Sequence, residues 1–163
     1  MKRLVVSDTS AITHLAKINS LHILQSLYIE ILIPEAVFKE LCHPKLPITL
    51  VNMVKKSTWI RVVPIKNYHV ANVLKSKLHI GESEAIALAH EKNADVLIID
   101  EKAGRFEAKK YVKIIGLVGV LLEAKKRKII TKVKPILLKL KNSGFKLSKP
   151  LFEIAMKKAG EAI

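Results

Sequence analysis

Short runs of apolar, often β-branched residues alternate with segments of helical periodicity along most of this chain. A β-branched run of four or five residues favours a buried strand, and an apolar repeat of three to four residues favours a helix. Strands that alternate with helices indicate a parallel sheet covered by helices on both faces. We therefore expect an α/β fold with strands at 2–6, 29–33, 59–63, 95–99 and 112–115.

The chain has 163 residues, a length that suits one domain. After the last expected strand only helical patterns follow, so residues of about 116–163 are predicted to form a helical C-terminal extension of the same domain. Cys42 is the single cysteine, which excludes a disulfide framework and fits a reducing compartment. The longest apolar run, Ile114 to Leu122, is short for a membrane span. We therefore expect a cytoplasmic protein without a membrane segment.

Positive charge is the main compositional signal. The chain carries 29 Lys and Arg against 14 Asp and Glu, a formal net charge of +15, and most of the excess follows residue 100. This asymmetry favours a polyanionic partner, most simply nucleic acid, although lysine used for solubility is the alternative. The candidate phosphate contacts are Arg105 and the basic run Lys125, Lys126, Arg127 and Lys128. A solvated helix end explains the run equally well.

Two aspartates stand where predicted strands end. Asp8 follows the first strand and Asp100 follows the most hydrophobic later one. Ligands of open parallel sheets bind at the carboxyl ends of the strands, where the strand order reverses. If the two strands are neighbours, both carboxylates face one crevice. Each could instead be an ordinary cap or turn residue, and Thr9 or Ser10 is the expected N-cap of the helix after the first strand.

Three glutamates extend this acidic pattern. On a helical wheel Glu40 lies within the apolar face of its helix, where an unpaired carboxylate is costly. Glu82 and Glu84 lie in the first turn of a later helix, where acids also favour the helix dipole. The wheel does not choose between Glu82 and Glu84.

Converging carboxylates need a cation to remain ionised together. Hard divalent ions such as Mg²⁺ and Mn²⁺ prefer oxygen ligands. Such an ion can activate water and stabilise charge on a phosphate, so acids on a basic protein point to phosphodiester hydrolysis. The residues support neither a zinc site nor a nucleotide cofactor.

Together these segments resemble the PIN-domain family of nucleases, and within it the VapC-like toxins. The blocks that carry the resemblance are VVSDTSAI (5–12), PEAVFKEL (34–41), GESEAIALA (81–89) and VLIIDEKAGR (96–105), with IIGLVGVLLEAKKRKII (114–130) and SGFKLSKPLFEIAMKKAGE (143–161) for the toxin subgroup. The resemblance implies a three-layer α/β/α sandwich around a parallel sheet of about five strands. It also implies an endoribonuclease that uses Mg²⁺ or Mn²⁺.

Carried over by position, the resemblance makes Asp8, Glu40, Glu84 and Asp100 the metal-binding and catalytic acids. Thr9 or Ser10 matches the hydroxyl neighbour that orients the first aspartate. It further implies RNA as substrate, a homodimer and, if the chain is a toxin, an antitoxin protein as partner.

The sequence departs from the family pattern at two places. Glu84 stands where aspartate is commoner, with Glu82 as a competitor for the role. Lys102 stands where many toxins have a further aspartate, and Glu101 is the nearest substitute. These departures leave the number of metals open, and they leave a catalytically weak or inactive binding module as the alternative function.

Overall fold

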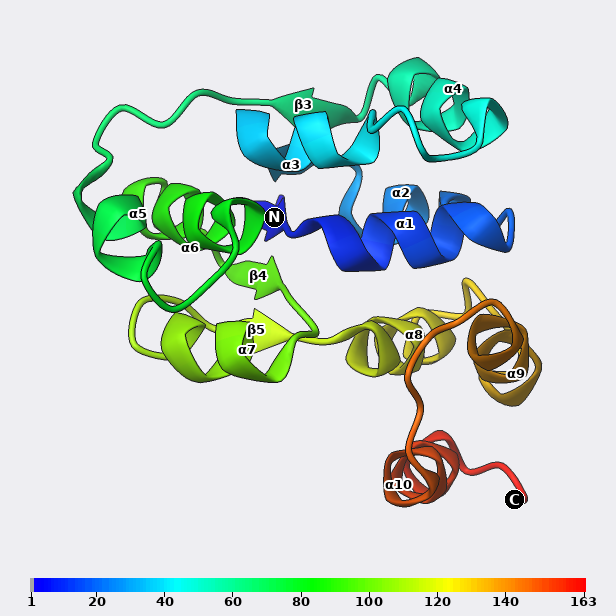
Figure 1. Cartoon of the computed structure of the whole chain (residues 1–163). Coiled ribbons are helices and arrows are strands. Elements are labelled where there is room, and N and C mark those ends of the chain that lie inside the picture. The colour runs from blue at the N-terminus through cyan, green and yellow to red at the C-terminus, as the bar shows by residue number, and fades with distance from the viewer. Residues whose placement is uncertain (1) are drawn as a thin grey trace.

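The computed structural model describes residues 2–163 and contains a five-stranded parallel sheet with helices packed around it (Figure 1). The strand order is β3-β2-β1-β4-β5. The strands are β1 (Val5–Ser7), β2 (Ile31–Ile33), β3 (Ile60–Val62), β4 (Val96–Ile98) and β5 (Ile114–Ile115). All five predicted strands are present, which confirms the α/β fold with a central parallel sheet.

The helices also follow the predicted pattern. Those that precede β5 are α1 (Thr9–Lys17), α2 (His22–Tyr28), α3 (Glu35–Leu41), α4 (Ile48–Lys56), α5 (His69–Leu74), α6 (Ile80–Glu91) and α7 (Lys102–Ala108). After β5 come α8 (Leu117–Lys126), α9 (Lys134–Asn142) and α10 (Lys149–Ala159). None of the helices in residues 2–163 is both long enough and apolar enough to cross a membrane.

The centre of the sheet forms the core. Strands β1, β2 and β4 are buried along their whole length, as expected for parallel strands with helices on both faces. Helix α6 packs on β1 and β4 and also contacts α3 and α7. Its buried alanines, Ala85, Ala87 and Ala89, give it little side-chain bulk, so its backbone lies close to the strands. This packing fixes the position of the first turn of α6 relative to the ends of β1 and β4.

The predicted N-cap of α1 is wrong. Strand β1 ends at Ser7, and Asp8 has an extended backbone with φ −76° and ψ 174°. Asp8 is therefore the N-cap, and its side chain accepts a hydrogen bond from the Thr9 amide. Thr9 and Ser10 lie inside the first turn because the strand passes into the helix without a spacer.

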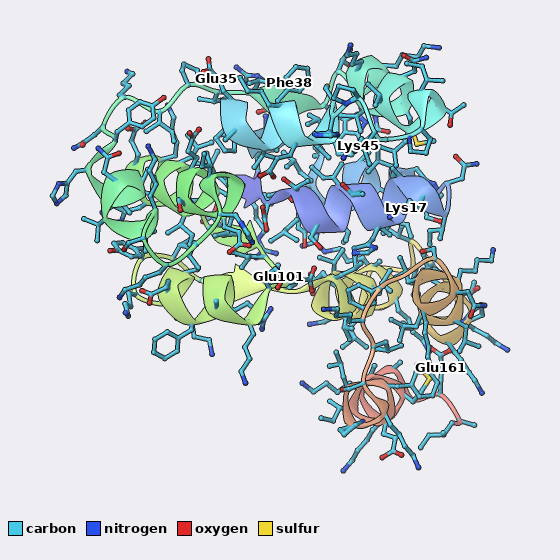
Figure 2. All side chains as sticks on the ribbon, viewed as in Figure 1. Lys17, Glu35, Phe38, Lys45, Glu101 and Glu161 are labelled. Carbon is cyan, nitrogen blue, oxygen red and sulfur yellow. The ribbon has the colours of Figure 1, made fainter. Side chains whose placement is uncertain are left out.

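A polar clamp attaches the C-terminal arm. Lys125 of α8 donates to the Ala159 carbonyl (2.6 Å) and to Glu161 Oε2 (3.0 Å). Glu161 also accepts from the Val133 and Lys134 amides at the start of α9. Figure 2 shows Glu161 in this position, beside α9 and α10. The clamp holds α10 beside α8, away from the sheet, as Figure 1 shows.

Candidate metal centre

The two strand-end aspartates lie at the point where the strand order reverses. Strand β1 pairs with β2 on one side and with β4 on the other, and Ser7 is in register with Ile98. The Asp8 amide donates to the Ile98 carbonyl (2.9 Å). Asp8 thus stands directly beside the end of β4, from which Asp100 follows two residues later. The neighbouring strands required by the sequence argument are present.

Asp8 is buried, with 4% of its surface exposed. Its Oδ1 accepts a hydrogen bond from the Thr9 amide (2.6 Å). As the N-cap, Asp8 has its carboxylate at the positive end of α1, which favours the charged form. The capping role and a place in an acidic site are therefore combined in one residue.

Glu40 reaches the same place from the last turn of α3. The Thr9 hydroxyl donates to Glu40 Oε2. Thr9 was expected to orient Asp8. It does so through its backbone amide, while its hydroxyl holds Glu40. The Glu40 carboxylate also rests against the first turn of α6, because a Cβ at Gly81 would lie only 2.6 Å from Glu40 Oε1.

Glu82 and Glu84 are separated by the structure. Glu82 is 7% exposed and lines a hollow together with Asp8 and Glu40. Glu84 Oε1 accepts from the Ala36 amide (3.4 Å) at the start of α3. Two residues on a helix differ by about 200° in direction, so the two side chains point to different neighbours. The structure therefore brings Glu82 to the other acids, and Glu84 caps α3.

Asp100 is held at one oxygen. Its Oδ1 accepts from the Leu117 amide at the start of α8 (2.9 Å), whereas its buried Oδ2 has no hydrogen-bond partner within residues 2–163. Arg105 lies beside it, with one guanidinium nitrogen donating to the Ile99 carbonyl (3.0 Å). Arg105 was predicted to contact RNA. In the structure it supports the turn that carries Asp100.

Glycines make room for three of the acids. Besides the contact of Gly81 with Glu40, a Cβ at Gly104 would lie 2.9 Å from Glu82 Oε2, and one at Gly116 would lie 2.9 Å from Asp100 Oδ1. Any larger residue would displace the carboxylate. This feature was missed in the sequence, because the three glycines lie on three different segments.

The acids of the hollow come from four separate segments. The hollow has a volume of about 280 Å³. Ser10, from α1, also lines it. Figure 2 shows two further lining residues, Lys17 on α1 and Glu101 on the connection from β4 to α7. Its acidic lining residues are Asp8, Glu40, Glu82 and Glu101.

Burial makes three carboxyl groups of this region, those of Asp8, Glu82 and Asp100, hard to ionise. It raises the pKa of Asp8 to about 7, against the lowering effect of the Thr9 amide, and the charges of Glu82, Glu40 and Asp100 add to the increase. Burial likewise raises the pKa of Glu82. It also raises that of Asp100, although the Leu117 amide and Arg105 oppose it. A bound cation would favour the charged form of all three.

The donor set fits a hard divalent cation. It consists of carboxylate oxygens, which Mg²⁺ and Mn²⁺ prefer, and the buried Asp100 Oδ2 lacks a partner. Across residues 2–163, no three His, Cys, Asp or Glu side chains stand close enough together to enclose an ion as they lie. Asp8, Glu40 and Glu82 therefore share one hollow without forming a closed cage. Binding an ion would require these side chains and the neighbouring Asp100 to move closer.

The predicted basic run lies elsewhere. It lies at the C-terminal end of α8, a helix that begins beside Asp100 and is about 15 Å long at 1.5 Å per residue. Lys125 belongs to the clamp on the C-terminal arm, and Arg127 pairs with Glu123 (3.0 Å) and donates to the Leu27 carbonyl. Lys126 and Lys128 are exposed.

Comparison with known families agrees with this geometry. A family model described as PIN domain matches residues 4–161. The chain therefore belongs to the PIN-domain family, whose members are generally nucleases. No curated protein matches the sequence.

The raised pKa of Asp8 predicts how stability depends on pH. A carboxyl group whose pKa is higher in the folded protein than in the unfolded chain stabilises the fold while it is protonated. This stabilisation is fully present below about pH 4 and is lost as the pH rises through about 7. For one group the loss reaches about 1.4 kcal/mol per pH unit. In EDTA, wild type should therefore lose stability relative to Asp8→Asn between pH 5 and pH 8.

Urea unfolding of both proteins at several pH values checks this. The difference between them is the quantity to follow, because the lowered pKa of His14 opposes the trend in both proteins alike. A difference that stays constant with pH would show that Asp8 is not a strained carboxylate.

Proposed function

We propose that this PIN-domain protein is a metal-dependent endoribonuclease. The observation that supports the proposal most directly is the meeting of Asp8, Glu40 and Glu82 in one hollow, with Asp100 beside it, where the strand order reverses. Buried carboxylates with raised pKa values, at a site expected for ligands, favour a functional role over a structural one.

In this proposal Asp8, Glu40, Glu82 and Asp100 hold Mg²⁺ or Mn²⁺. Glu82 replaces Glu84 in this set because it shares the hollow with Asp8. The cation, when bound, supplies positive charge that polarises the phosphodiester and stabilises the transition state.

The chain's own residues position the reacting groups. The Thr9 hydroxyl and amide hold Glu40 and Asp8, and the Leu117 amide holds Asp100 at Oδ1, leaving Oδ2 to face a ligand. These hydrogen bonds keep the carboxylates near one another, which limits the movement needed when a cation binds. Surrounding lysines, on a chain of net charge +15, would attract the RNA backbone.

Removal of divalent metal tests the proposal. Purified protein should cleave single-stranded RNA in Mg²⁺ or Mn²⁺, and EDTA should lower the rate by at least about 100-fold, with recovery when excess metal is restored. Gel analysis of a labelled RNA measures this. Cleavage that persists in EDTA would contradict the proposal, and RNA binding with no cleavage in either metal would favour the alternative of an inactive binding module.

The toxin role, the antitoxin partner, the homodimer and the cytoplasmic location implied above belong to the same proposal. The toxin role and the antitoxin partner rest on the resemblance to VapC-like toxins, and the homodimer rests on the resemblance to the PIN-domain family. The cytoplasmic location rests on the single cysteine, Cys42, which fits a reducing compartment. The chemistry at the acids requires none of them.

A further inference from the structure

A second hollow adjoins the acids on the side of the α9–α10 loop. Its volume is about 390 Å³, within the usual size range of about 300–1,000 Å³ for small-ligand pockets. It shares Ser10, His14 and Glu101 with the acidic hollow, and Asp100 forms part of its wall. The two hollows thus adjoin, and a ligand in one lies next to the other.

The chemistry of the second hollow differs from that of the first. Lys102 and Lys146 line it, both are exposed, and neither forms an ion pair or a side-chain hydrogen bond within the described residues. Phe145 also lines it, with its ring packed edge-to-face against His14 at a centroid distance of 5.2 Å. The hollow therefore offers two unpaired cations beside a wall that includes Phe145, a core residue that is 8% exposed.

Unsatisfied polar atoms gather around the two hollows. Buried atoms without a hydrogen-bond partner within residues 2–163 include Thr13 Oγ1, His14 Nδ1 and Asp100 Oδ2. Each belongs to a residue that lines one hollow or both. Buried polar atoms normally find partners, so their grouping indicates that a polar ligand completes this region.

We propose that the second hollow is the subsite for one unpaired nucleotide of the RNA, next to the bond to be cleaved. Lys102 and Lys146 bind its phosphate, and Phe145 with His14 packs against its base. The hollow is too small for a base pair with both strands, so the substrate is single-stranded at this position. This inference rests on the proposed ribonuclease function, and it assigns a substrate-binding role to the α9–α10 loop.

Binding without cleavage tests the subsite separately from the enzymatic activity. Fluorescence anisotropy in EDTA would measure the Kd of a labelled, short single-stranded RNA. The double variant Lys102→Ala with Lys146→Ala should weaken binding by about tenfold and reduce the slope of log affinity against log salt by about 0.7, the value for one lost phosphate contact on a single strand. The charge-matched control is Lys126→Ala with Lys128→Ala, from the basic run, which should change both quantities much less.

The aromatic part has its own variant. Phe145→Leu retains an apolar side chain but removes the ring, so it should reduce the preference of the protein for single-stranded RNA over a duplex of the same sequence. A melting curve shows whether the variant is folded. If it is unfolded, the comparison of the two lysine double variants still tests the proposed subsite.

The proposal is wrong if the two lysine double variants bind RNA alike, if the basic-run variant is the weaker one, or if wild type binds duplex as tightly as single strands. Failure of the nuclease proposal looks different. In that case the Lys102 and Lys146 variant still binds RNA more weakly than the control, but wild type cleaves nothing in Mg²⁺ or Mn²⁺.

Discussion

Asp8→Asn is expected to lower kcat/KM for RNA cleavage by about 100- to 1,000-fold, the size of loss seen when one stabilising group is removed from an active site. Asn keeps the shape and the acceptor oxygen that caps α1, but it removes the negative charge that a divalent cation requires. The measurement is initial rates of RNA cleavage in Mg²⁺ and in Mn²⁺, with both proteins purified in parallel.

Folding controls separate this effect from damage to the protein. Because Asp8 is 4% exposed and its pKa is raised to about 7, the uncharged variant should melt in EDTA at a temperature no lower than wild type at pH 8. A folded Asp8→Asn protein with normal activity would exclude Asp8 from the catalytic set. It would also suggest that the measured cleavage comes from a contaminating nuclease.

Glu82→Gln and Glu84→Gln are expected to differ widely in their effects. Glu82→Gln removes a charge from the acidic hollow and should lower kcat/KM by about 100-fold. Glu84→Gln should change it by less than about threefold, because the glutamine side-chain oxygen can still accept from the Ala36 amide. The two changes are chemically identical and lie in one turn of α6, so each controls for the other.

Metal binding provides the second readout. The stabilisation by Mn²⁺, measured as a shift in melting temperature, should be reduced in Glu82→Gln and retained in Glu84→Gln. If Glu84→Gln instead loses activity and stabilisation by Mn²⁺, then Glu84, the residue matched by family resemblance, is the metal ligand. The side chains of α6 would then have to rearrange from the positions in the structure when the metal binds.

Much of the acidic site is predictable because its residues stand at strand ends. Asp8 and Asp100 directly follow buried β-branched runs, and parallel strands place their carboxyl ends at one edge of the sheet. Glu40 is recognisable because a carboxylate within an apolar helix face is costly. In each case a local pattern determines where the side chain points.

Other features depend on packing that no local pattern contains. The register of α6 against α3 and β1 sends Glu82 to the hollow and Glu84 to the Ala36 amide, although the two are only two residues apart in the helix. The sequence placed both in the first turn, but α6 begins at Ile80 and its first turn contains Glu82 alone. The basic run looks available in the sequence, but Lys125 and Arg127 have partners far away in the chain. Lys146 lies in the α9–α10 loop, whose place depends on the clamp around Glu161 that holds the C-terminal arm beside α8.

The sequence by itself determined the alternation of strands and helices, and with it the parallel sheet and the two aspartates at its edge. The physical reason is that backbone hydrogen bonding and burial of β-branched runs act over a few neighbouring residues. The tertiary structure decided which glutamate joins Asp8, which lysines stay unpaired and which loop borders the acids. These depend on contacts between segments far apart in the chain, where a rotation of one helix by half a turn would exchange Glu82 for Glu84.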